Sequence, residues 1–126
     1  MGLQNLGLAA MAGLTGNTGS ITAFTYLELG TDATAFAATQ TALVSAITTS
    51  GLARAAATVS RTTTTVTNDT LRLLKLWTAS GTQTVREAGI FNAAASGTML
   101  ARKVLGTARS LVSGDTFSYT YDIIFA

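Results

Sequence analysis

The chain contains neither cysteine nor histidine among its 126 residues. Their absence excludes thiol nucleophiles, the Ser-His and Cys-His pairs of hydrolases, and the cysteine and histidine ligands of zinc sites. Disulfide bonds are excluded as well. We therefore predict that the protein is not an enzyme, has no catalytic residues and binds neither a metal ion nor a cofactor.

Charge is also scarce, since only 11% of the residues are charged, against roughly 25% in an average soluble protein. The acidic residues are scattered singly and show no ligand spacing. The basic residues form no run of five, and only Arg102 and Lys103 are adjacent. We expect neither nucleic acid nor a small-molecule substrate as a partner. So neutral a surface favours a subunit of an assembly, and a small Thr-coated monomer is the alternative.

The first fourteen residues carry no charge, but they lack the basic start of a signal peptide and are too short to span a membrane. Gly2, Gly7 and Gly13 interrupt the stretch. We predict an extended N-terminal arm over residues 1–20, followed by one domain over residues 21–126, and no membrane partner. A first strand or a frayed terminus of the same domain is the alternative.

Proline is absent too, so glycine marks the turns, and the dipeptide Ser-Gly occurs at residues 50–51, 80–81, 96–97 and 113–114. Between these turns the dominant pattern alternates apolar and polar residues, most clearly from Phe117 to Phe125, which predicts a half-buried strand. Leu71 to Trp77 is apolar on both faces and predicts a central strand. Thr58 to Thr67 predicts an exposed edge strand. Further strands are predicted over residues 22–29, 85–91 and 99–105.

Only one region favours a helix. Apolar residues between Ala33 and Ile47 fall at spacings of three and four, and Thr39 is a possible cap, so we predict a short helix over residues 39–48. Many short strands with one small helix predict an all-β fold: an antiparallel β-sandwich or jelly-roll-like domain with one short helix and an extended N-terminal arm.

Four segments resemble short bacteriophage virion proteins, the capsid decoration and tail-fibre-like family. They are Thr25 to Gly30 with the Thr/Ala-rich stretch and Thr39 to Leu43 after it, Thr67 to Leu71, Glu87 to Asn92, and Gly97 to Arg102. The resemblance implies a virion structural role. Within these segments, Gly89 permits a bulge or a close backbone approach, Glu87 is expected to pair with Arg86, and Asn92 to begin a turn.

Because the chain is short, the leading hypothesis is a capsid decoration (cement) protein that binds the major capsid protein on the outer capsid surface. The alternatives are a tail fibre or baseplate accessory protein bound to a tail protein, and a surface- or carbohydrate-binding module that uses Trp77. We expect a homodimer or homotrimer, made in the bacterial host cytoplasm and located in the virion. The residues predicted to make contacts are Leu3, Leu6, Leu8, Met11, Arg61, Thr62, Thr63, Thr64 and Thr65.

Overall fold

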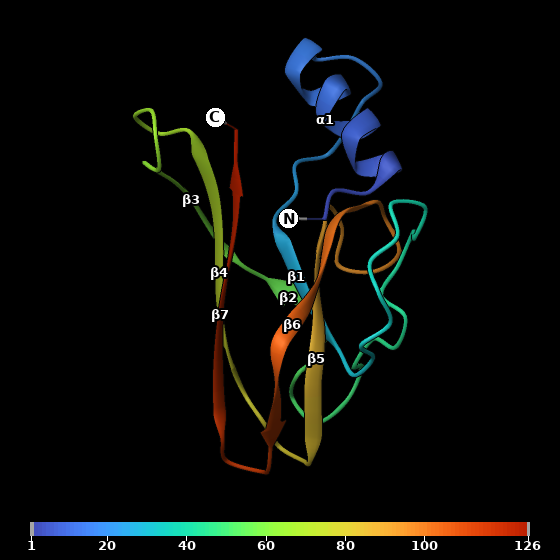
Figure 1. Ribbon diagram of the computed structural model, residues 1–126, viewed down its shortest axis with the longest axis vertical. Coiled ribbons are helices and arrows are strands. Elements are labelled where there is room, and N and C mark those ends of the chain that lie inside the picture. Colours follow the sequence, from blue (N-terminus) through green and yellow to red (C-terminus); the bar gives the residue numbers. More distant parts are fainter. Residues whose placement is uncertain (1, 126) are drawn as a thin grey trace.

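The computed structural model describes residues 2–125, which form two antiparallel β-sheets packed face to face and one helix at an end of the sandwich (Figure 1). The helix comes first and the seven strands follow it along the chain. Their bounds are α1 Asn5–Gly16, β1 Tyr26–Gly30, β2 Ala55–Ala56, β3 Thr58–Thr62, β4 Thr70–Thr78, β5 Gln83–Phe91, β6 Met99–Leu111 and β7 Thr116–Ile124. The prediction of an all-β antiparallel sandwich with one short helix is confirmed.

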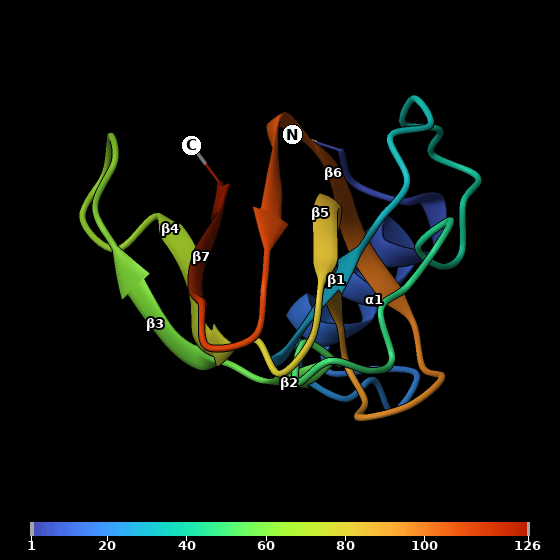
Figure 2. The same cartoon turned by 90° about the horizontal axis from the view of Figure 1, so that it is seen from below.

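Sheet A has the strand order β2-β1-β5-β6, and sheet B has the order β3-β4-β7. Figure 2, seen from below, shows the two sheets side by side, and Figure 1 shows the β4–β5 and β6–β7 connections between them at the lower end of the molecule. One crossing runs directly from β2 to β3 through Ala57, and another is the turn at Ser113-Gly114 between β6 and β7. Since β6 and β7 belong to different sheets and do not pair, the sandwich is open along that side.

The core lies between the sheets and explains the alternating pattern of the sequence. In β7, Phe117, Tyr121 and Ile123 are buried, while Ser118 and Thr120 between them are exposed. The buried side chains join one cluster with residues of β1, β4, β5 and β6. Burying each large apolar side chain stabilises the fold by about 1.5–3 kcal/mol. The predicted edge position of the Thr-rich strand is confirmed, because β3 is the outer strand of sheet B.

β4 is the central strand of sheet B, as predicted, but it is not buried on both faces. Leu73 and Trp77 point into the core, whereas Leu74 is 41% exposed and Leu76 is 59% exposed. No element of residues 2–125 covers the outer face of sheet B, so the second apolar stripe of this strand remains on the surface.

The predicted helix over residues 39–48 is wrong, because this segment is an irregular loop on sheet A. Its backbone is held by groups far along the chain: the amides of Val44 and Ser45 donate to the Glu87 carboxylate, and the amide of Ile47 donates to the carbonyl of Leu29. These bonds replace the hydrogen bonds of a helix. The apolar residues that suggested a helical face, Leu43 and Ile47, are buried instead in two different clusters.

The helix lies instead in the predicted N-terminal arm, of which only residues 2–4 are extended, so the arm prediction is wrong for residues 5–16. Leucine, alanine and methionine in this segment favour a helix. Gly7 is buried against β6, where a Cβ atom would overlap the carbonyl oxygen of Leu100, so this glycine serves packing rather than breaking the helix. Asn17, at φ 50°, ends α1 in the left-handed region.

Candidate functional site

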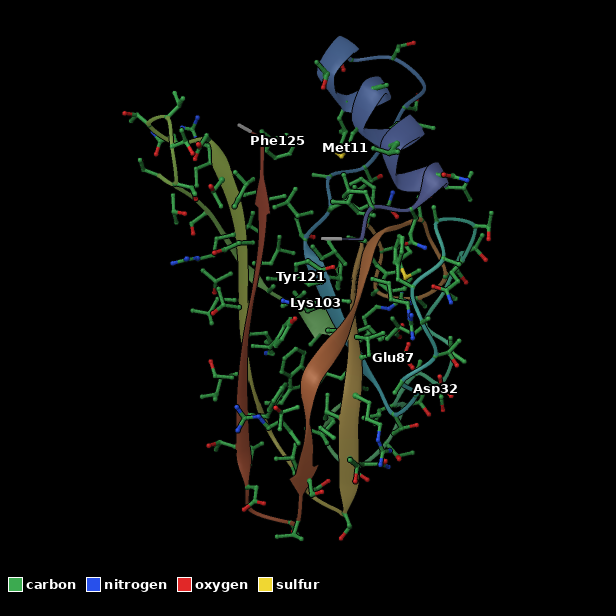
Figure 3. All side chains as sticks on the ribbon, viewed as in Figure 1. Met11, Asp32, Glu87, Lys103, Tyr121 and Phe125 are labelled. Carbon is green, nitrogen blue, oxygen red and sulfur yellow. The ribbon has the colours of Figure 1, made fainter. Side chains whose placement is uncertain are left out.

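An apolar groove opens where sheet B diverges from α1, at the end of the sandwich that holds both Met11 and Phe125 (Figure 3). It has a volume of about 260 Å³. The walls come from α1, the segment before β1, β3, β4, β6 and the C-terminal end of the chain. The main lining residues are Met11, Leu14, Phe24, Val59, Leu71 and Phe125. We call this surface the α1 groove.

Within residues 2–125, no charged side chain lines the α1 groove. Three of its apolar residues are open to solvent, with Leu14 38%, Val59 41% and Phe125 58% exposed. Contiguous exposed apolar surface of this kind marks sites of association, because covering it removes apolar area from water. Met11 adds an unbranched side chain that adapts to an irregular partner. The groove therefore suits an apolar segment of another protein rather than a polar metabolite.

The structure separates the N-terminal residues that we predicted to make contacts. Leu3 forms a β-bridge with Ala101 and packs against the core, so it supports the fold. Leu6 and Leu8 lie on α1 and are 55% and 50% exposed. Met11 lines the α1 groove. Of the predicted N-terminal contact residues, only Met11 therefore lines the groove, while Leu3 packs on the core and Leu6 and Leu8 face solvent.

The second group of predicted contact residues, Arg61 to Thr65, lies on and after β3, which forms the wall of the α1 groove opposite the helix. Arg61 and Thr62 belong to β3, which also supplies Val59 to the α1 groove. Thr63, Thr64 and Thr65 follow in the exposed loop between β3 and β4. Sequence reasoning missed Leu14, Val59 and Phe125. The spacing of three between Met11 and Leu14 is a helical signal that pairs those two residues, but nothing in the sequence brings Val59 and Phe125 next to them.

A buried ion pair holds the long loop between β1 and β2 against sheet A. The Nε atom of Arg102 donates to Oε1 of Glu87 at 2.9 Å, and both side chains are completely buried. The Glu87 carboxylate also accepts the backbone amides of Val44, Ser45 and Asp32 at 3.0, 2.9 and 3.2 Å. The expected pairing of Glu87 with Arg86 is therefore wrong. Because β5 and β6 are adjacent, the partner of Glu87 comes from the neighbouring strand.

Further hydrogen bonds fasten this loop to β6 and to the start of the chain. Nη1 of Arg102 donates to the carbonyl of Thr34 at 2.9 Å. Nε2 of the buried Gln4 donates to the carbonyls of Ala37 and Gln40 at 3.0 and 2.7 Å. Gly89 allows the same loop to approach β5, because a Cβ atom there would lie 2.9 Å from Cδ2 of Leu43. Nearly all of these polar groups are used in holding the loop, so their role is structural.

Trp77, the residue considered for carbohydrate binding, is 3% exposed, and its Nε1 donates to the carbonyl of Ala53 at 3.0 Å. It belongs to the core and offers no platform for a sugar. Across residues 2–125, no group of three or more acidic side chains is placed to hold a metal ion. The same part of the chain has no helix long and apolar enough to cross a membrane.

A family model described as Podophage GP4 fiber I protein gp80 matches residues 9–124, from within α1 to the end of β7. No curated protein and no solved structure matches the chain. The match includes the walls of the α1 groove other than Phe125, together with both residues of the buried Glu87–Arg102 pair. The chain therefore belongs to the Podophage GP4 fiber I protein gp80 family and is a bacteriophage virion structural protein.

Proposed function

We propose that this chain is a subunit of a phage fibre and that it works by assembly rather than by catalysis. The observation that carries the proposal is the match of residues 9–124 to a fibre protein family. The family description favours the fibre over the capsid decoration role that chain length suggested. Binding that occurs only in the assembled state shifts the equilibrium toward assembly, which is all that a structural subunit requires.

The α1 groove supports assembly, and we propose that its occupant is a second copy of this chain. The β3–β4 loop lies at the same end of the molecule as the groove (Figure 1). It carries Val66, which is 61% exposed, among neutral threonines. An apolar side chain among neutral threonines is a suitable match for a groove that has no charged lining within residues 2–125.

The β3–β4 loop is also rigid enough to insert without a large entropic cost. The carboxylate of Asp69 accepts the backbone amides of Thr64, Thr65 and Val66 at 2.8–2.9 Å. These bonds hold the pKa of Asp69 well below its usual range, because they stabilise the ionised form. A preorganised loop loses little conformational freedom when it binds.

A loop of one copy in the groove of the next is a heterologous contact, which closes into a ring when the rotation between copies allows it. We propose a homotrimer, the smallest ring that heterologous contacts close, and the alternative is a homodimer in which two copies exchange their loops reciprocally. The copies would stand side by side, because the β3–β4 loop lies at the same end of the molecule as α1, which forms one wall of the groove (Figure 1).

Light scattering on the purified chain tests this arrangement. We expect an oligomer for the wild type and a monomer for Val66→Asp and for Leu14→Ser combined with Phe125→Ser. Leu76→Ser is the matched control. Leu76 is as exposed as Val66 and Phe125, but it lies on the outer face of sheet B, away from the groove. A monomeric wild type, or groove variants that assemble as the wild type does, would count against the α1 groove as the contact.

A further inference from the structure

A second recess lies on the open side of the sandwich, between the unpaired strands β6 and β7. Two cavities of about 300 and 270 Å³ follow this side and share Lys103 and Tyr119. Their lining includes the cations Lys103 and Arg109, the aromatic residues Phe117, Tyr119 and Tyr121, and one carboxylate, Asp122, which is paired with Arg72. Figure 3 shows Lys103 and Tyr121 close together between the two sheets. We call this recess the β6–β7 slot.

Both walls of the β6–β7 slot are free strand edges. β7 pairs only with β4, and β6 pairs with β5 and, at Leu100 to Arg102, with residues 2–4. Along the edge that faces away from the one partner strand, residues 103–110 of β6 and 116–124 of β7 therefore carry amides and carbonyls with no strand partner among residues 2–125. Such edges are templates for an additional strand.

The slot gathers positive charge that the described part of the chain does not neutralise. Lys103 and Arg109 line it, and Lys75 stands opposite Tyr119 on the same face of sheet B. Within residues 2–125, none of these three cations forms an ion pair. The other basic residues are mostly engaged, with Arg54, Arg72 and Arg102 in ion pairs.

A second copy of the chain is a poor source of this anion, because each of its six acidic side chains already has a partner within the chain. Three are in ion pairs and three accept backbone amides in turns. They are Glu28, Glu87 and Asp122 in the pairs, and Asp32, Asp69 and Asp115 in the turns. The charge of the slot thus indicates a different, anionic partner.

One buried polar atom also lacks a partner at this place. Tyr121 is 3% exposed, lines the slot, and its hydroxyl has no hydrogen-bond partner within residues 2–125. Burial raises the pKa of the neighbouring Tyr119 to about 12 and that of Tyr121 further, so both stay neutral donors at physiological pH. An unpaired buried hydroxyl is costly unless a ligand or water satisfies it.

From these observations we infer that the β6–β7 slot binds an extended acidic segment of another protein, which pairs with the free edge of β7 and directs carboxylates to Lys103 and Arg109. The backbone supplies hydrogen bonds at regular spacing, and alternate side chains supply the charge. A sugar fits less well, because two of the three aromatic residues that line the slot, Phe117 and Tyr121, are 8% and 3% exposed, and the third, Tyr119, is partly buried. This inference goes beyond the assembly of identical copies at the α1 groove.

Fluorescence anisotropy tests the inference with the full chain and a labelled nine-residue peptide of alternating threonine and glutamate, which matches β7 in length. The control peptide has glutamine in place of glutamate. We expect the acidic peptide to bind about tenfold more tightly, since two partly screened charge pairs together supply that difference. Its binding should shift the amide resonances of residues 103–110 and 116–124.

The matched variants are Lys103→Gln combined with Arg109→Gln, and Arg61→Gln as the control on β3. The double variant should bind the two peptides equally well, and Arg61→Gln should keep the preference for the glutamate peptide. Both variants should have the circular dichroism spectrum of the wild type. Equal binding of the two peptides, no binding, or resonance shifts confined to the α1 groove would overturn the inference. Binding of polygalacturonate without binding of the acidic peptide would also overturn it, and would assign the slot to acidic glycans.

Discussion

Oε1 of Glu87 lies 2.9 Å from Nε of Arg102, and neither side chain is exposed to solvent. Through this pair and its backbone partners, β5 and β6 hold a loop that begins at residue 31 and has almost no regular structure of its own. Two of the segments that resemble phage virion proteins, Glu87 to Asn92 and Gly97 to Arg102, each contribute one member. Their resemblance therefore reflects a requirement of the fold rather than a reactive site.

Replacing Glu87 with glutamine should lower the free energy of unfolding by about 3–5 kcal/mol, because Arg102 would remain buried without a counter-charge. Urea denaturation measures the change. The partly exposed pair Arg72 and Asp122 is the control: Asp122→Asn should lower the free energy of unfolding by no more than about 1 kcal/mol. Equal losses for the two variants would show that the buried pair has no special structural role.

Gly7→Ala should destabilise the protein by about 1–3 kcal/mol, because the added methyl group would overlap the backbone of Leu100 and push α1 away from β6. Gly16→Ala makes the same chemical change near the end of α1, where the nearest atom, Cγ2 of Thr18, is 3.7 Å away. That variant should be neutral or slightly more stable. Thermal unfolding distinguishes the two, and a Gly7→Ala variant as stable as Gly16→Ala would contradict the observed packing of the helix.

The Asp69 side chain should make the β3–β4 loop sensitive to acid. Its pKa is lowered in the folded state by the amides of Val66, Thr64 and Thr65, so its stabilising contribution is complete above the unfolded pKa of about 3.8 and is lost as the pH falls toward the folded value. The wild type should therefore melt at a higher temperature than Asp69→Asn at pH 7. The difference between the two melting temperatures should become smaller below pH 4. A difference that is independent of pH would show that the carboxylate charge does not hold the loop.

The strands could be predicted because their signals are local. In β7, alternation from Phe117 to Ile123 directly reports which face meets the core. The loop around Leu43 could not be predicted, because its alanines and leucine have helical spacing while its amides bind Glu87 more than forty residues away. A contact so distant in sequence overrides local propensity.

The candidate site was predictable only in part, for the same reason. Met11 was selected for its apolar character and does line the α1 groove. Val59 and Phe125 join it only because β3 and the end of the chain after β7 reach the same end of the sandwich as α1. Alternation of apolar and polar residues predicts a strand, but it does not predict which other element of the fold that strand will face.

The position of the protein on the particle is the most direct test of its assignment to a fibre. Electron cryomicroscopy of the phage that encodes this chain, carrying an epitope tag at the exposed Ser113-Gly114 turn and a bound antibody fragment, would show where the added density lies. We predict density on a fibre, in a repeating arrangement of copies. Density distributed over the capsid shell, with none on a fibre, would contradict the fibre assignment and establish the protein as a capsid decoration protein.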